Sequence, residues 1–154
     1  MNTLKIVQYF KLVTAQGRTH RFQNYFVGST STLLGETYDF APFRADGALA
    51  SLNGENQQFQ VLFPNLEYAL RLVEEANGNR LSQLTFSTAW LDGNDQIDRP
   101  VTDYYLGIGA SFSETTIELR FRSAIDSVGS QFPGRTLTRD LVGPLPLNAE
   151  LYLR

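Results

Sequence analysis

Apolar and polar residues alternate along most of this sequence, which is the pattern of β-strands with one buried face. About eight or nine such runs, rich in β-branched and aromatic residues, are separated by Gly, Asn, Asp and Ser turns. Short strands at this spacing are typical of sandwiches and barrels. The sequence therefore predicts an all-β fold, a β-barrel or compact sandwich, with one short α-helix.

Hairpins are predicted near both ends of this pattern. Residues 4–14 form an alternating run that turns at 15–17 and returns over 20–27. Residues 84–91 have a bulky and a smaller face, which predicts a central strand. A later hairpin turns at Ser113-Glu114 and continues one apolar face through Tyr104, Leu106, Ile108, Ala110, Phe112, Ile117, Leu119 and Phe121.

The middle of the chain mixes turn signals with one more strand. Residues 28–32 predict a turn. Pro42 cannot donate a ladder hydrogen bond, so it indicates an edge strand or an exposed loop. Residues 59–63 alternate and predict a half-buried strand, whose partner we expect at 48–52.

One helix is predicted over residues 65–77. Asn65 follows Pro64 as a suitable N-cap, and Asn77-Gly78 supplies a C-cap. A lone helix must bury its apolar face against the sheet, so we expect it to cover one end of the barrel. The predicted apolar stripe consists of Leu66, Ala69, Leu70 and Val73.

The chain divides into a domain and an arm. Residues 1–130 are predicted to form one β-barrel-like domain, because a chain of 154 residues can bury one sizeable core. Residues 131–154 contain Pro133, Pro144 and Pro146 and cannot form a regular helix. This C-terminal arm packs either on its own domain or on a neighbouring subunit.

Composition excludes several classes of function. The 13 basic and 16 acidic residues are scattered and give a net charge of −3, so nucleic-acid binding is disfavoured. The absence of cysteine excludes disulfides, thiolate metal sites and thiol nucleophiles. Lys5 and Lys11 interrupt the N-terminal apolar stretch, and no run approaches the roughly 20 apolar residues of a membrane span. We therefore expect a protein made and kept soluble in a cytoplasm.

No catalytic constellation is evident. His20 is the only histidine, and acid–base or metal chemistry needs a positioned set of groups. Residues 92–98 resemble a calcium loop, but Ile97 stands where the turn glycine belongs, so a hairpin turn is the better interpretation. Gly107-Ile108-Gly109 lies within a strand and indicates close packing rather than dinucleotide binding. We expect no enzymatic activity, cofactor or metal site.

Aromatic residues around Pro42 are candidates for an assembly interface, because Tyr, Phe and Arg are enriched in interface cores. Burial in the chain's own core explains Phe40 and Phe43 equally well. The candidate interface residues are Tyr38, Phe40, Phe43 and Arg44, together with Phe132, Arg135, Leu145 and Leu147 in the arm.

Two stretches carry a family resemblance. Residues 38–53 form an aromatic-Pro loop that leads through a glycine into a short strand, and 131–135 read Gln-Phe-Pro-Gly-Arg after the last hairpin. With the Asn65-Leu66 helix start between them, their order resembles the N-terminal domain of the phage minor tail protein L family. The matching order covers nearly the entire chain.

The resemblance implies a structural subunit of a phage tail tip or baseplate that bridges the tail tube and the central hub or spike by ring assembly. It implies a homo-oligomer, with a trimer favoured and a hexamer also compatible with a sixfold tube. Other tail proteins are the implied partners, and the implied location is the virion tail after assembly in the host cytoplasm. Longer family members continue into a cysteine-rich iron–sulfur segment, which this cysteine-free sequence cannot match.

Two alternatives remain open. The first is a non-catalytic β-sandwich module that binds a ligand such as carbohydrate through Trp90 or the Tyr104-Tyr105 pair. The second is an enzyme whose carboxylates the sequence does not reveal, with Glu114 and Asp92 as candidates.

Overall fold

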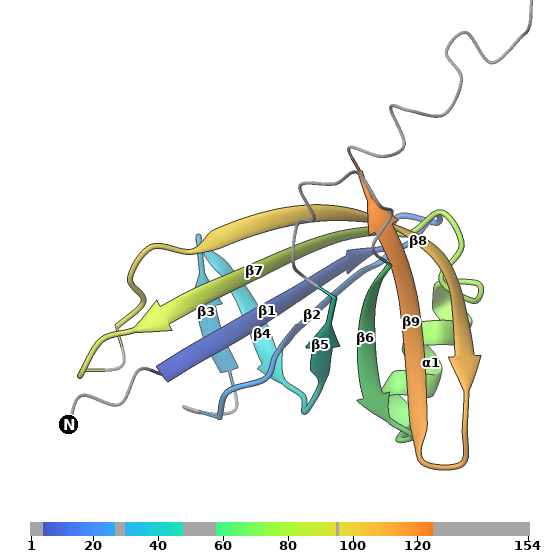
Figure 1. Cartoon of the computed structure of the whole chain (residues 1–154), viewed down its shortest axis with the longest axis horizontal. Helices are drawn as coiled ribbons and strands as arrows, with labels where there is room; N and C mark the ends of the chain where they lie inside the picture. Colours follow the sequence, from blue (N-terminus) through green and yellow to red (C-terminus); the bar gives the residue numbers. More distant parts are fainter. Residues whose placement is uncertain (1–4, 27–29, 48–57, 95, 125–154) are drawn as a thin grey trace, which may run out of the picture.

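The computed structural model describes residues 5–26, 30–47, 58–94 and 96–124. The predicted partner strand at 48–52 and the predicted arm at 131–154 lie outside these residues. No helix in the described ranges is long and apolar enough to cross a membrane. In chain order the described elements are β1 (Lys5–Val13), β2 (Thr19–Gln23), β3 (Thr30–Leu33), β4 (Glu36–Phe40), β5 (Arg44–Asp46), β6 (Phe59–Pro64), α1 (Glu67–Glu75), β7 (Gln83–Leu91), β8 (Val101–Phe112) and β9 (Thr116–Ser123) (Figure 1).

All the described strands belong to one mixed sheet with the order β3-β4-β2-β1-β7-β8-β9-β6-β5. Paired strands run antiparallel except β2 and β4, which run parallel. β7 occupies the middle position, as its two-sided pattern predicts. The expected all-β class with one short helix is confirmed, and the sheet is not closed into a barrel by hydrogen bonds.

A short corner between β4 and β5 makes the sheet curl. These strands lie near opposite ends of the sheet, yet only Ala41, Pro42 and Phe43 separate them, a connection that spans at most about 14 Å. The corner is held by the Ala41 amide, which donates to the Gln23 carbonyl over 2.9 Å, and by the Tyr68 hydroxyl, which donates to the Pro42 carbonyl over 3.2 Å. Pro42 lies in an exposed loop, as its missing donor predicts.

Hydrophobic side chains are buried on both faces of the sheet. Phe10 and Leu12 of β1 point to one face, while Val7 and Tyr9 point to the other, because successive strand residues alternate. The larger cluster also contains Phe43, Phe59, Val61, Phe63, Ala69, Leu72, Val73, Ala76, Leu84, Phe86, Ile117, Leu119 and Phe121. The smaller cluster, on the opposite face, consists of Val7, Tyr9, Leu33, Tyr38, Ala89 and Leu91.

The helix forms where predicted but with a different start and a different buried face. Leu66, not Asn65, is the N-cap residue, because the Asn65 side chain donates to the carbonyls of Ser113 and Glu114 in the β8–β9 turn. Asn77 and Gly78 end the helix with φ values of 49° and 68°, the left-handed conformation of a C-cap. The buried stripe is Ala69, Leu72, Val73 and Ala76, so the predicted members Leu66 and Leu70 are exposed.

A β-bulge at Gly107–Gly109 overturns the prediction of one continuous apolar face on β8. The register with β9 shifts there, so Tyr105 points inward before the bulge and Ala110 points inward after it. Asn79 packs against the bulge: a Cβ on Gly107 would lie 2.2 Å from the Asn79 carbonyl oxygen. Gly107 is therefore a site of close backbone packing, as predicted. The expected inward residues Tyr104, Ile108 and Phe112 are exposed.

Candidate assembly surface

The β3–β4 hairpin forms one end of the described sheet, where the sequence predicts only a turn at 28–32. β3 contains no charged residue or proline, whereas β5 at the other end carries Arg44 and Asp46. Charged side chains on an edge strand discourage pairing with another chain. The β3 end is therefore the less protected of the two ends of the described sheet.

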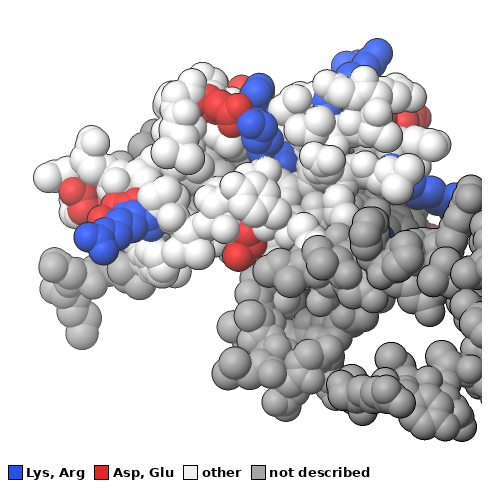
Figure 2. Space-filling model, turned by 90° about the horizontal axis from the view of Figure 1, so that it is seen from above, with Lys and Arg blue, Asp and Glu red and all other residues white. Residues whose placement is uncertain are grey.

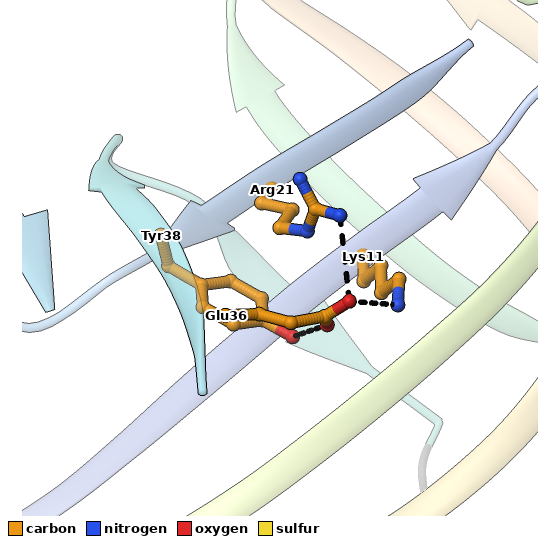
Figure 3. A network of polar contacts seen from close by, with 4 residues as sticks. All are labelled: Lys11, Arg21, Glu36 and Tyr38. Atoms are coloured by element: carbon orange, nitrogen blue, oxygen red, sulfur yellow. Dashed lines mark hydrogen bonds and ion pairs between the residues drawn. The ribbon is translucent and has the colours of Figure 1, made fainter. Parts of the chain in front are cut away.

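Glu36 attaches this hairpin to the sheet (Figure 3). Its Oε1 lies 2.5 Å from Lys11 Nζ on β1 and 3.3 Å from Arg21 Nη2 on β2, and its Oε2 accepts a 3.3 Å hydrogen bond from the Tyr38 hydroxyl. Lys11 and Arg21 are cross-strand partners, so both cations face the hairpin from adjacent strands. One carboxylate thus connects β4 to β2, its neighbour in the sheet, and to β1, the next strand along.

The electrostatics of this group follow from its burial and charges. The hydrogen bond from Lys11 lowers the pKa of Glu36 below its ordinary value of 4.5; desolvation opposes this, and the charges of Lys11 and Arg21 reinforce it. Burial, followed by the nearby Glu36 carboxylate, raises the pKa of Tyr38 to about 12. At neutral pH a charged Glu36 therefore accepts from a neutral Tyr38 hydroxyl.

Aromatic packing beneath the hairpin fixes it further. The rings of Tyr9 and Tyr38 meet edge to face with centroids 5.0 Å apart, and the Tyr9 hydroxyl lies 2.9 Å from the Ser31 hydroxyl. Leu33 is buried in the same cluster. The hairpin is thus held by apolar, aromatic and ionic contacts together.

Three large hydrophobic side chains remain exposed on or beside the hairpin. Phe26 is 67% exposed and packs edge to face against Phe40, which is 36% exposed, with ring centroids 5.0 Å apart. Leu34, at the β3–β4 turn, is 82% exposed. We call Leu34, Phe26, Phe40 and the outer edge of β3 the hairpin surface. Phe26 and Phe40 are in contact, whereas Leu34 lies at the other end of β4, and it is contiguous apolar groups that mark contacts with other molecules.

Of the interface residues predicted from the sequence, the structure buries some and exposes others. Tyr38 and Phe43 are buried in the two hydrophobic clusters and present little surface to a partner, whereas Phe40 and Arg44 are exposed. Sequence reasoning missed Phe26 and Leu34, because Leu34-Gly35 is not one of the residue pairs that usually signal a two-residue hairpin turn. Phe132, Arg135, Leu145 and Leu147 lie outside the described residues, and their assignment stays a prediction.

His20 and Asp92, which were considered for catalysis or metal binding, make contacts within the fold. His20 Nε2 on β2 lies 2.9 Å from Glu75 Oε2, which joins the sheet to α1. The Asp92 carboxylate accepts from the backbone amides of Asn94 and Gln96 over 2.8 and 2.9 Å, the geometry of a turn. Within the described ranges, no group of three or more His, Cys, Asp or Glu could hold a metal ion.

The aromatic residues considered for carbohydrate binding do not share one face. Tyr105 stacks on Phe59 with centroids 4.3 Å apart, and burial raises the pKa of its hydroxyl to about 12. Tyr104 pairs with Thr85, whereas Trp90 has the parity of Phe86, so Tyr104 and Trp90 point to opposite faces of the sheet. They cannot form a common platform for a sugar ring.

Charged side chains on the face seen in Figure 2 lie in small mixed groups. Some Lys and Arg stand beside Asp and Glu and others stand apart from them, with uncharged surface between the groups. Phosphate backbones are bound by continuous basic surface. The described residues show no continuous basic surface on this face.

The described fold is a curled mixed sheet with one packed helix and an apolar edge hairpin. It is similar to a chain in a solved structure described as "Virion of native gene transfer agent (GTA) particle", with a TM-score of 0.63 and 14% sequence identity. The match covers 86% of this chain and 44% of that chain, so this chain spans less than half the length of its neighbour. At this identity the likeness shows a shared fold. No protein-family model and no curated protein sequence matches the chain, so the resemblance to the minor tail protein L family stays a prediction.

Proposed function

We propose that this protein is a structural subunit of a phage-like virion, placed at the tail tip or baseplate. It bridges the tail tube and the central hub or spike by forming a ring with other copies of itself, a trimer being favoured. It acts through assembly rather than catalysis. Its location is the virion tail.

The observation that carries this proposal is the fold likeness to a chain of a gene transfer agent virion over 86% of this chain. The independent resemblance of its sequence motifs to the minor tail protein L family points to the same class of particle. The hairpin surface adds a physical argument, because a subunit needs exposed apolar groups held rigidly for contact with neighbours. An edge strand with uncharged side chains also offers its backbone to another chain.

Native mass spectrometry of the purified chain, together with immunogold electron microscopy of phage-like particles from its source, tests the proposal. We expect a closed ring of identical copies in solution and gold label at the tail end of the particles. An antibody against the capsid of the same particles is the control for labelling position. A chain that stays monomeric at high concentration and is missing from purified particles would refute the proposal.

A further inference from the structure

The last turn of α1 ends in a Schellman motif that contains Asn77 and Gly78. The Asn77 amide donates to the Glu74 carbonyl over 3.1 Å, and the Gly78 amide donates to the Val73 carbonyl over 3.0 Å. These are the two hydrogen bonds that define the motif, in which glycine is the usual residue at the position of Asn77. An asparagine at this position, followed by glycine, places a chemically reactive pair at the end of the helix.

Asn-Gly is the pair in which asparagine deamidates most readily, because glycine has no side chain to shield the attacking nitrogen. The Gly78 nitrogen gives its proton to hydroxide and forms a bond with Asn77 Cγ, the bond from Cγ to Nδ2 breaks, and ammonia leaves. Water then opens the succinimide ring at either carbonyl and gives aspartate or isoaspartate. Asn77 is exposed, so water and hydroxide have access to it.

The hydrogen bond from Gly78 restrains the nitrogen that must attack. While this N–H points at the Val73 carbonyl the nitrogen keeps its proton, so ring closure requires the bond to break first. Helix ends open locally more often than a whole domain unfolds. Asn79, next in the chain, is fully buried and bound to carbonyls of β8 and β9. The opening that exposes Asn77 to the reaction is therefore confined to the last turn of α1.

Glu75, the last residue of α1, connects this turn to the sheet. Its Oε1 lies 2.9 Å from Arg18 Nη1 in the β1–β2 turn, and its Oε2 lies 2.9 Å from His20 Nε2 on β2. α1 has no basic residue in its own last turn, so Arg18 supplies the cation that stabilises the negative end of the helix dipole. Breaking these contacts adds to the cost of opening the turn.

We propose that Asn77 is a site of spontaneous deamidation and that the contacts of Glu75 with Arg18 and His20 control its rate. The modification places a new carboxylate after Glu74 and Glu75, where the helix dipole disfavours negative charge. Each event therefore destabilises the end of α1 permanently. This inference is independent of the proposed function.

The first test follows the reaction in the full chain at mildly alkaline pH by tryptic digestion and mass spectrometry. Residues 72–80 form one tryptic peptide that contains both Asn77 and Asn79, and fragmentation distinguishes the two. We expect modification at Asn77, whereas Asn79, which is buried and precedes an arginine, should stay intact. In concentrated urea Asn77 should react at least about tenfold faster, because the hydrogen bond of Gly78 is lost there.

The second test compares Glu75→Gln with its matched control Glu74→Gln. Both variants remove one negative charge from the end of α1, but the exposed Glu74 side chain has no ion pair among the described residues. Glu75→Gln should accelerate the reaction of Asn77 about two- to fivefold, the range expected for the loss of partly exposed ion pairs. Glu74→Gln should react like the wild type. Urea unfolding of both variants verifies that they are folded.

Three outcomes would overturn the inference. The first is an Asn77 that stays unmodified in the folded wild type and in Glu75→Gln alike, and the second is an equal rate in the folded chain and in urea. The third is equal acceleration by both glutamine variants, because helix charge alone would then explain it. Arg18→Ala removes one contact and leaves the sequence of α1 intact, so it tests the same contacts if Glu75→Gln does not fold, and an unchanged rate in this variant would contradict their role.

Discussion

The Asn79 side chain stabilises the β8 bulge, and its removal allows a quantitative prediction. Asn79 is fully buried, and its Nδ2 donates to the carbonyls of Gly109 over 3.2 Å and Arg120 over 3.0 Å. These carbonyls belong to β8 and β9 at the point where their register shifts. One amide group therefore links two strands where the regular ladder is interrupted.

Asn79→Ala removes both donors and also places alanine at a φ of 61°. Leaving a buried carbonyl without its donor costs about 1–3 kcal/mol, so two cost at least about 2 kcal/mol. The left-handed conformation adds about 1–2 kcal/mol for a residue other than Gly or Asn. We expect the free energy of unfolding to fall by at least about 3 kcal/mol.

Asn77→Ala is the matched control, because Asn77 also has a positive φ, 49°, but lies exposed at the end of α1. Its free energy of unfolding should fall only by the cost of placing alanine in a left-handed backbone conformation. Urea unfolding followed by the fluorescence of Trp90, the one tryptophan, measures both variants. With a slope of about 2 kcal/mol per molar urea, Asn79→Ala should unfold at least about 1 M earlier than Asn77→Ala. Equal midpoints for the two variants would refute the argument that the Asn79 amide stabilises the bulge.

Two further predictions concern charge and core packing. The lowered pKa of Glu36 means that its carboxylate stabilises the fold above pH 4.5 and that this contribution is lost as the pH falls below that value. Since Glu36 is one-third exposed, Glu36→Gln should lower the free energy of unfolding by less than about 1 kcal/mol at pH 7, and by less still at pH 3. Urea unfolding at both pH values measures this. A midpoint displaced equally at the two pH values would contradict the prediction. Phe10→Ala should lower the free energy of unfolding by about 3–5 kcal/mol, because Phe10 is fully buried. Phe112→Ala should lower it by about 0.5 kcal/mol, because Phe112 is exposed. Comparable losses for the two variants in calorimetry would show that this assignment of the core is wrong.

Local patterns in the sequence predicted several elements correctly because neighbouring residues determine them. The alternation of 59–63 predicts β6, whose burial alternates residue by residue. Asn77-Gly78 ends the helix because these two residue types tolerate positive φ. In α1, however, two overlapping stripes satisfy the same spacing, and only packing against the sheet selects Leu72 over Leu70 as the buried residue.

Features that depend on distant partners could not be predicted in this way. The bulge in β8 is determined by β9 and by Asn79, whereas the alternation of β8 alone suggests one continuous face. The β3–β4 hairpin was missed because Thr30–Thr32 is polar and Leu34-Gly35 lacks the usual Asn.

The candidate site depends in the same way on tertiary packing. Tyr38 is buried because Tyr9, far away in the sequence, packs against its ring. Phe40, two residues later and on the same side of β4, remains exposed beside Phe26. Composition identified this segment as aromatic, but only the fold distinguishes its buried members from its accessible ones.

The pairing of β1 with β7 has a consequence for synthesis of the protein. β1 pairs along its whole length with β7, from Lys5 with Leu91 to Val13 with Gln83. On the ribosome β2 can pair with one side of β1 early, but the other side must wait until Leu91 has emerged. During that interval a strand with apolar residues on both faces has an open edge, which favours aggregation between nascent chains. Translation speed and chaperone supply should therefore affect the yield of this protein.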